Sequence, residues 1–221
     1  MINPKPYLDY VYDFEGRTFR NQFEEMYREC ECPWPHQTES DNIQYKFVLE
    51  CLRKSESLNI LDLGCGLGYF SDMLRSLGKV TAVDISQTCI NKAKNTFPNV
   101  RFNVADISAP LPLSSSDFDA VACLGVLWFV LPKIHQVLDE IYRILKPGGE
   151  AIFGLNIPEN PIGKEVIETP QDFFDIVRSH FYIENLFSYY HLEGTTQLKD
   201  GDIAYYIHAS RPRTTPGATT I

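Results

Sequence analysis

The chain has 221 residues, of which 44% are hydrophobic, and a formal net charge of −9 at pH 7. This length can bury one full core, and the acidic balance disfavours nucleic acid as a partner, because phosphate backbones are usually bound by basic surfaces. No apolar run approaches the roughly 20 residues that span a bilayer, and no signal-peptide pattern opens the sequence. We therefore expect a cytoplasmic protein that binds neither nucleic acid nor membrane.

The first elements in chain order are two amphipathic helices. The first 16 residues have no periodicity and are predicted to form a loose lead-in. Apolar residues at helical spacing then predict a helix over 17–30, which ends before a proline. Ser40 or Asp41 is predicted to cap a second helix that ends at Leu52.

The clustered cysteines in this region are possible metal ligands. Cys30 and Cys32 are close in sequence, and His36 would be a third ligand, but the spacing is unlike that of a zinc site. We expect reduced thiols and no metal.

A strand, a glycine turn and a helix follow, and the rest of the chain is arranged around them. An apolar run over 60–63 enters Gly64, Gly66 and Gly68, and helical spacing resumes over 70–77. The glycines permit positive φ and a close approach of the backbone to a ligand. A second strand over 79–84 ends on Asp84, where a carboxylate can accept both ribose hydroxyls of an adenosine.

Two details separate this turn from a dinucleotide site. Its spacing is Gly-x-Gly-x-Gly, not the Gly-x-Gly-x-x-Gly that accommodates a pyrophosphate, which disfavours a nicotinamide-dependent dehydrogenase. Asp62 also precedes the first glycine, where its charge would oppose a phosphate but suit an ammonium or sulfonium group.

The remaining chain alternates helices and strands until its last third. The predicted elements are a helix over 87–97, strands over 100–105 and 120–124, a helix over 131–145, a strand over 150–156, a helix over 170–177 and a strand pair over 181–192 and 202–209. This alternation predicts a parallel sheet with right-handed crossovers and a ligand crevice at the carboxyl ends of the strands.

The run Asp62-Leu63-Gly64-Cys65-Gly66-Leu67-Gly68 resembles motif I of the class I S-adenosylmethionine-dependent methyltransferases. The Leu-Pro-Leu to Phe-Asp-Ala stretch over 111–120 and the Leu-Lys-Pro-Gly-Gly turn over 145–149 are also similar to that family. The resemblance implies an α/β fold with a Rossmann-like, doubly wound, mostly parallel seven-stranded sheet and an antiparallel C-terminal hairpin. It also implies an N-terminal helical lid over 1–56 and a methyltransferase domain over 57–210. The residues over 211–221 are rich in Thr, Pro and Gly, which predicts a flexible tail.

The resemblance implies S-adenosylmethionine as cofactor and S-adenosylhomocysteine as product. Asp106 would accept a hydrogen bond from the adenine amino group, and Ile107 would lie against the ring. The full predicted cofactor set is Asp62, Gly64, Cys65, Gly66, Gly68, Asp84, Ile85, Asp106, Ile107, Leu124 and Tyr45. The alternatives are that Asp106 is an ordinary loop residue and that Tyr45 only packs its helix onto the sheet.

Methyl transfer requires little beyond positioning, because the sulfonium methyl is already activated. Many relatives place a histidine or carboxylate after the fourth strand, but here the stretch over 123–129 has no ionisable side chain. The catalytic residue is therefore unknown, with His191 as a weak candidate. The predicted acceptor pocket is Trp34, Trp128, Tyr189 and Tyr190, which could equally be core residues.

We predict in-line SN2 transfer to an N or O atom of a small molecule, with an amine or amino sugar slightly favoured, by a monomer or homodimer. The alternative is a catalytically silent methyltransferase-fold protein that binds the nucleoside or a protein partner.

Overall fold

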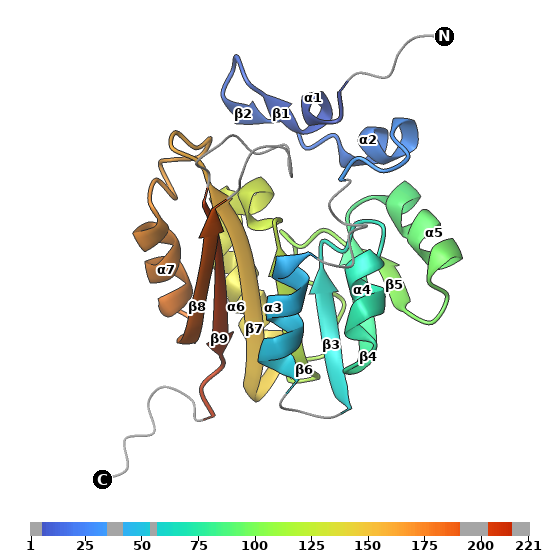
Figure 1. Cartoon of the computed structure of the whole chain (residues 1–221), viewed down its shortest axis with the longest axis vertical. Coiled ribbons are helices and arrows are strands. Elements are labelled where there is room, and N and C mark those ends of the chain that lie inside the picture. The colour runs from blue at the N-terminus through green and yellow to red at the C-terminus, as the bar shows by residue number, and fades with distance from the viewer. Residues whose placement is uncertain (1–5, 35–41, 54–56, 191–202, 214–221) are drawn as a thin grey trace.

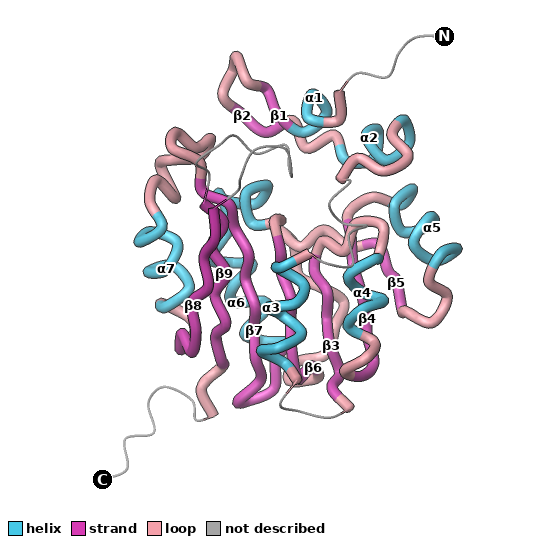
Figure 2. The backbone as a smooth tube through the Cα atoms, viewed as in Figure 1, coloured by secondary structure: helices cyan, strands magenta, loops and turns pink. Residues whose placement is uncertain are grey.

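The computed structural model describes residues 6–34, 42–53, 57–190 and 203–213, with a seven-stranded sheet at its centre (Figures 1 and 2). The strands are β3 (Leu58–Leu63), β4 (Gly78–Asp84), β5 (Arg101–Val104), β6 (Phe118–Leu124), β7 (Leu145–Ile157), β8 (Tyr182–Tyr190) and β9 (Ile203–Ser210). Their order is β5-β4-β3-β6-β7-β9-β8. The pairs from β5 to β7 are parallel, and β9 is antiparallel to both of its neighbours, which confirms the predicted fold class.

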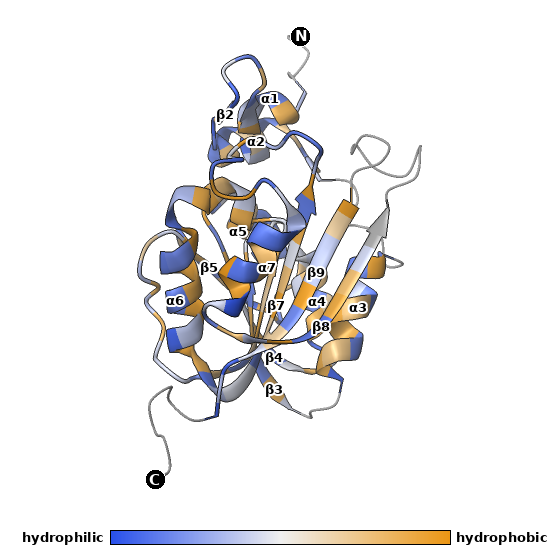
Figure 3. Cartoon of the chain, turned by 90° about the vertical axis from the view of Figure 1, so that its left-hand side faces the viewer, coloured by the Kyte–Doolittle hydropathy of each residue, from blue (hydrophilic) through white to orange (hydrophobic). Residues whose placement is uncertain are grey.

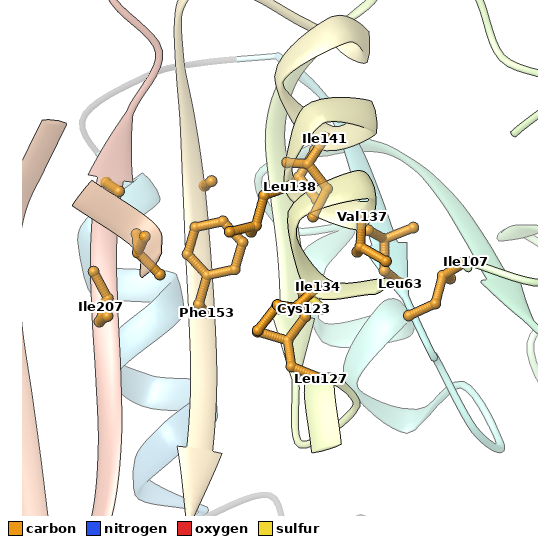
Figure 4. Close-up of a cluster of buried hydrophobic side chains, with 14 of the residues drawn as sticks. Leu63, Ile107, Cys123, Leu127, Ile134, Val137, Leu138, Ile141, Phe153 and Ile207 are labelled. Atoms are coloured by element: carbon orange, nitrogen blue, oxygen red, sulfur yellow. The ribbon is translucent and has the colours of Figure 1, made fainter. Parts of the chain in front are cut away.

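Helices cover both faces of the sheet and form two cores. The helices on one face are α3 (Ile43–Leu52), α4 (Tyr69–Leu74) and α5 (Gln87–Thr96), and those on the other are α6 (Ile134–Ile144) and α7 (Pro170–Arg178). Figure 4 shows the core on the side of α6 and α7, in which Leu138 of α6 lies near Phe153 of β7 and Val137 near Leu63 of β3. In Figure 3, hydrophilic and hydrophobic residues alternate around α6, as expected for a helix with one buried face.

The register of the sheet brings several strand ends to one edge. Leu63 at the end of β3 pairs with Val83 of β4 and with Cys123 of β6. The residues that follow these strands therefore meet above the same edge, where parallel α/β sheets bind ligands.

A small N-terminal unit lies above this edge (Figure 1). It consists of α1 (Leu8–Val11), the two-residue strands β1 (Tyr12–Asp13) and β2 (Thr18–Phe19), and α2 (Phe23–Glu29). The prediction of a helix over 17–30 is wrong for residues 17–22, which are not helical. Arg17 and Asn21 have φ values of +50° and +53°, which a right-handed helix cannot contain, so the helix begins only at Phe23.

The second predicted helix has a different role from the lid expected of it. Val48 and Leu52 of α3 are fully buried in the core formed with α4 and α5, so α3 is part of the helical layer on the sheet. Its cap is Asn42, whose side chain accepts a hydrogen bond from the Gln44 N–H at 3.0 Å. The predicted caps, Ser40 and Asp41, lie outside the described residues.

Two further boundaries differ from the predictions. The helix expected from residue 131 begins at Ile134, because a 3-10 helix, η2 (Leu127–Lys133), contains Pro132 and precedes it. The Leu-Lys-Pro-Gly-Gly stretch is not a separate turn but the first part of β7, with a shift in its register against β6. Among the helices of the described residues, none has the length and apolar character needed to cross a bilayer.

Candidate active site

The turn after β3 is built on glycines with left-handed backbone conformations. Gly64, Gly66 and Gly68 have φ values of +73°, +54° and +84°, and Gly68 is the N-cap of α4. A Cβ atom at Gly64 would lie 2.3 Å from a methyl carbon of Val126, so only glycine fits there. The turn therefore passes close to the residues that follow β6.

Asp84 at the end of β4 is held by two backbone donors. The Gly66 N–H donates to its Oδ2 and the Ser86 N–H to its Oδ1, each at 3.0 Å. The side chain is 8% exposed, and this burial raises the pKa of Asp84, although both hydrogen bonds act in the opposite direction. Each carboxylate oxygen keeps further acceptor capacity for a ligand hydroxyl.

Above this edge lies a cavity of about 190 Å³ that joins three parts of the chain. The residues from the strand ends are Gly64, Asp84, Ile85, Ala105, Asp106, Ile107 and Ser108. Those from the start of η2 and the residue before it are Val126, Phe129 and Val130, and those from the N-terminal unit and its continuation are Asn21, Phe23, Tyr27 and Trp34. The structure thus brings together six predicted site residues, namely Gly64, Asp84, Ile85, Asp106, Ile107 and Trp34.

Aromatic contacts hold the N-terminal unit against η2. The ring of Phe129 lies 4.9 Å from that of Phe23 and 5.5 Å from that of Phe19, and the Asn21 side chain donates to the Phe129 carbonyl at 3.3 Å. Asn21, Phe23 and Tyr27 were not among the site residues predicted from the sequence. The four-residue spacing of Phe23 and Tyr27 correctly indicated one buried helix face, but it does not reveal that this face looks onto a ligand cavity.

Asp62 does not line the cavity. Its side chain is 3% exposed beneath the glycine turn, and its Oδ2 accepts a hydrogen bond from the Ser71 hydroxyl at 2.6 Å. Burial raises the pKa of Asp62 to about 7, the Ser71 hydrogen bond lowers it, and repulsion from Asp84 raises it further. Asp62 therefore supports the glycine turn from below through Ser71 and is not part of the cavity wall.

This raised pKa predicts a pH-dependent stability difference for Asp62→Asn. The folded protein binds a proton that the unfolded chain releases near pH 4, so the wild type loses stability as the pH rises from about 4 to 7. The amide introduced by the substitution cannot ionise and still offers an oxygen to Ser71. We expect the variant to be more stable at pH 8, by up to about 4 kcal/mol, and the two proteins to converge near pH 4.

Urea unfolding of both proteins between pH 4.5 and 8 measures this difference. Burial lowers the pKa of His208, but its Cys51 and Glu150 partners outweigh this effect and raise the pKa to about 9. Its contribution to the change of stability with pH is similar in both proteins and therefore cancels in the difference between them. A stability difference that stays constant with pH would rule out ionisation of Asp62 as its cause.

Several other predicted residues lie in the cores. Tyr45 is 5% exposed and stacks on Phe70 with ring centroids 4.4 Å apart, and Cys65 is 6% exposed. Trp128 is 8% exposed, and its indole N–H donates to the Asn156 carbonyl at 2.7 Å. These contacts favour the packing alternative for Tyr45 and Trp128. The other predicted residues that do not line the cavity are Gly66, Gly68 and Leu124.

The remaining candidates fall at or beyond the described regions. Tyr189 and Tyr190 end β8, but their side chains lie outside the described part of the chain, as do His191 and His36. Among the described residues, no three His, Cys, Asp or Glu side chains gather in a way that could hold a metal ion.

Comparisons with known proteins agree with this geometry. Residues 61–153 match the family model described as a methyltransferase domain. The chain is 32% identical over 142 residues to a malonyl-[acyl-carrier protein] O-methyltransferase of Erwinia pyrifoliae, covering 62% of this chain and 48% of that protein. It is 33% identical over 124 residues to a ubiquinone biosynthesis O-methyltransferase of Alkalilimnicola ehrlichii, covering 54% and 49%. The chain thus spans about half the length of these curated relatives.

Solved structures share the fold at lower identity. The N-methyltransferase NodS from Bradyrhizobium japonicum, in complex with S-adenosyl-L-homocysteine, superposes with a TM-score of 0.68 at 17% identity, covering 86% of this chain and 97% of that one. The [4+2]-cyclase SpnF gives 0.64 at 18% identity, covering 78% and 81%. The family model thus identifies residues 61–153 as a methyltransferase domain, and the solved structures share the Rossmann-like fold of its sheet.

Proposed function

We propose that this protein transfers the methyl group of S-adenosylmethionine to a small-molecule acceptor. The observation that carries the proposal is the carboxylate of Asp84, which two backbone N–H groups hold at the wall of the cavity beside Gly64. A ribose presents two adjacent hydroxyl donors, and each fits one carboxylate oxygen.

The loop after β5 supports an adenine site beside this ribose site. Asp106 lies on the cavity wall, and its Oδ1 accepts a hydrogen bond from the Ser108 N–H at 2.8 Å, which orients the carboxylate. Ile85 is 51% exposed although it is apolar, and Ile107 lies on the same cavity. A bound adenine ring between these two side chains would cover the exposed surface of Ile85.

S-adenosylmethionine supplies a methyl group on a positively charged sulfur, which leaves as a neutral thioether. The acceptor's lone pair would form the bond to the methyl carbon as the sulfur–carbon bond breaks, and a methylated amine would then release a proton to solvent. The protein's part is to hold the acceptor in line and to exclude water. Phe23, Tyr27 and Phe129 contribute to the exclusion of water, because their aromatic side chains line the cavity.

The lining of the cavity favours an amine or another neutral nucleophile as the acceptor. Four of its side chains are aromatic, namely those of Phe23, Tyr27, Trp34 and Phe129, and none of the described lining residues is Lys, Arg or His. A carboxylate acceptor would lack a cationic partner there. A hydroxyl would lack a base, because the two lining carboxylates, Asp84 and Asp106, are assigned to the ribose and the adenine. Aromatic faces would attract the protonated amine, which would release a proton to solvent and then supply the lone pair that attacks the methyl group.

Calorimetric titration with S-adenosylmethionine, S-adenosylhomocysteine and NAD tests the cofactor, and release of S-adenosylhomocysteine in the presence of amines, amino sugars, phenols and carboxylates tests the acceptor. We expect both adenosyl ligands to bind, NAD not to bind, and amines to react fastest. Faster methylation of carboxylates would overturn the acceptor class.

Two other outcomes would change the conclusion more deeply. Cofactor binding without methylation of any acceptor class would favour a methyltransferase-fold protein that is catalytically silent in methyl transfer. The [4+2]-cyclase SpnF, named for another reaction, has the same fold. Failure of both adenosyl ligands to bind would overturn the proposed function itself.

A further inference from the structure

Glu24, in the first turn of α2, is bound to the start of α5. Its Oε2 accepts hydrogen bonds from the Ser86 hydroxyl at 2.7 Å and the Thr88 N–H at 3.1 Å, and its Oε1 accepts one from the Thr88 hydroxyl at 2.5 Å. The hydrogen bonds from Ser86 and Thr88 lower the pKa of Glu24 to about 2, so the side chain is ionised at any physiological pH. A negative charge also suits the positive end of the α5 dipole.

Lys92 makes the matching contact from α5 back to α2. Its Nζ donates to the carbonyl oxygens of Tyr27 at 2.6 Å and Cys30 at 3.1 Å, at the C-terminal end of α2. These are carbonyls that a helix leaves without partners, and a cation is favoured at that end. We call Glu24, Ser86, Thr88 and Lys92 the α2–α5 clasp. Figure 1 shows α2 above α5, and the two helices are in contact.

The clasp is connected directly to the candidate cofactor site. Ser86 donates its hydroxyl to Glu24, and its backbone N–H to the Oδ1 of Asp84 at 3.0 Å. On the other side of Glu24, Phe23 and Tyr27 of α2 line the cavity that Asp84 also lines. The same residue, Ser86, therefore touches both the cover of the cavity and the carboxylate at its wall.

A movement of α2 would change the access of a ligand to Asp84. With α2 in place, the Asp84 side chain is only 8% exposed, and Tyr27 is 3% exposed. A shift of the N-terminal unit away from the strand ends would widen the route to the carboxylate, because Phe23 and Tyr27 of α2 line the cavity together with Asp84. Such a shift separates α2 from α5 and breaks the hydrogen bonds of Glu24 and Lys92.

We propose that the α2–α5 clasp holds the N-terminal unit closed over the nucleoside and sets the rate at which S-adenosylhomocysteine leaves, with Glu24 and Lys92 as positioning residues. This inference rests on the proposed function, because it requires a nucleoside in the cavity. It assigns these two side chains a role in ligand exchange rather than in the transfer step.

The test compares Glu24→Gln and Lys92→Met with Glu25→Gln as a matched control. Glu25 lies next to Glu24 on α2, outside the clasp, so its replacement makes the same change of charge without breaking a clasp contact. Stopped-flow displacement, followed by the fluorescence of Trp34 at the cavity wall, gives the dissociation rate of S-adenosylhomocysteine. We expect both clasp variants to release it about 10-fold faster or more, with Glu25→Gln unchanged, since hydrogen bonds to charged groups are lost.

Hydrogen exchange of the ligand-free proteins supplies a second readout. The amide of Cys30, which donates to the Met26 carbonyl, should exchange faster in the two clasp variants than in the control. A fold that is merely less stable would lower the melting temperature and speed exchange in the central strands as well. If Glu24→Gln fails to fold, Lys92→Met decides the question.

The outcomes separate this inference from the function on which it rests. If the wild type binds S-adenosylhomocysteine and both folded clasp variants release it at the wild-type rate, the clasp role is wrong and the proposed function stands. Equal acceleration in Glu25→Gln would also overturn the clasp, because it would assign the effect to net charge. If the wild type binds no adenosyl ligand, the function and the clasp role fail together.

Discussion

Replacement of Asp84 by Ala should weaken the binding of S-adenosylhomocysteine by about 100-fold or more, which is the largest loss of affinity that we expect from a single side chain. Under the proposed ribose assignment, the variant loses two hydrogen bonds that the ribose hydroxyls would donate to the charged carboxylate, each contributing about 1.5–3 kcal/mol. It also leaves the N–H groups of Gly66 and Ser86 without their partner, so the glycine turn loosens. Isothermal titration calorimetry on the folded variant measures the change.

Asp84→Asn separates the two causes of this loss. One side-chain position becomes an NH₂ group, which faces either the Gly66 or the Ser86 N–H as a second donor, so we expect weaker binding although the shape is kept. Asp117→Ala is the control, because that carboxylate is exposed at the opposite end of the sheet. An Asp84→Ala affinity within about threefold of the wild type would contradict the ribose assignment.

Local spacing accounts for the parts of the site that the sequence could predict. The three glycines and Asp62 lie within seven residues, and their backbone conformations follow from residue type and from the strand and helix on either side. Asp84 ends a strand whose pattern is continuous, so its place at the sheet edge follows from the alternation of elements. The family resemblance then supplied the cofactor without any knowledge of distant contacts.

Contacts between distant segments account for what the sequence could not predict. Glu24 meets Ser86 across 62 positions, and Asn21 meets Phe129 across 108, and no periodic pattern encodes either pair. The apolar spacing in the sequence is equally compatible with Asn21 inside a helix. In the structure Asn21 has a positive φ, and the chain turns over the cavity at this residue. The sequence could not decide whether Trp128 belongs to the acceptor pocket or to the core for the same reason. Its hydrogen-bond partner, the Asn156 carbonyl, is brought near it only by tertiary packing.

Gly64→Ala should both destabilise the protein and close the cavity. At a φ of +73°, a residue with a Cβ atom loses about 1–2 kcal/mol of folding stability relative to glycine. The new methyl group would also lie 2.3 Å from the Cγ2 of Val126, and this overpacking adds a loss of about 1–3 kcal/mol. We expect a loss of about 2–5 kcal/mol in the free energy of unfolding and a drop in cofactor affinity, because Gly64 lines the cavity. Urea unfolding and calorimetric titration measure the two effects.

Gly125→Ala isolates the backbone cost from the steric cost. Gly125 has a similar φ of +69°, but no heavy atom of the described residues lies within 4 Å of the position that the new methyl group would take, so we expect only the loss of about 1–2 kcal/mol. In Gly64→Ala/Val126→Ala the two clashing methyl carbons are absent and the nearest remaining atom is the Cβ at 3.2 Å, so the double variant should recover part of the loss. A double-mutant cycle with no coupling between the two positions would contradict the steric account, because residues in contact should not act additively.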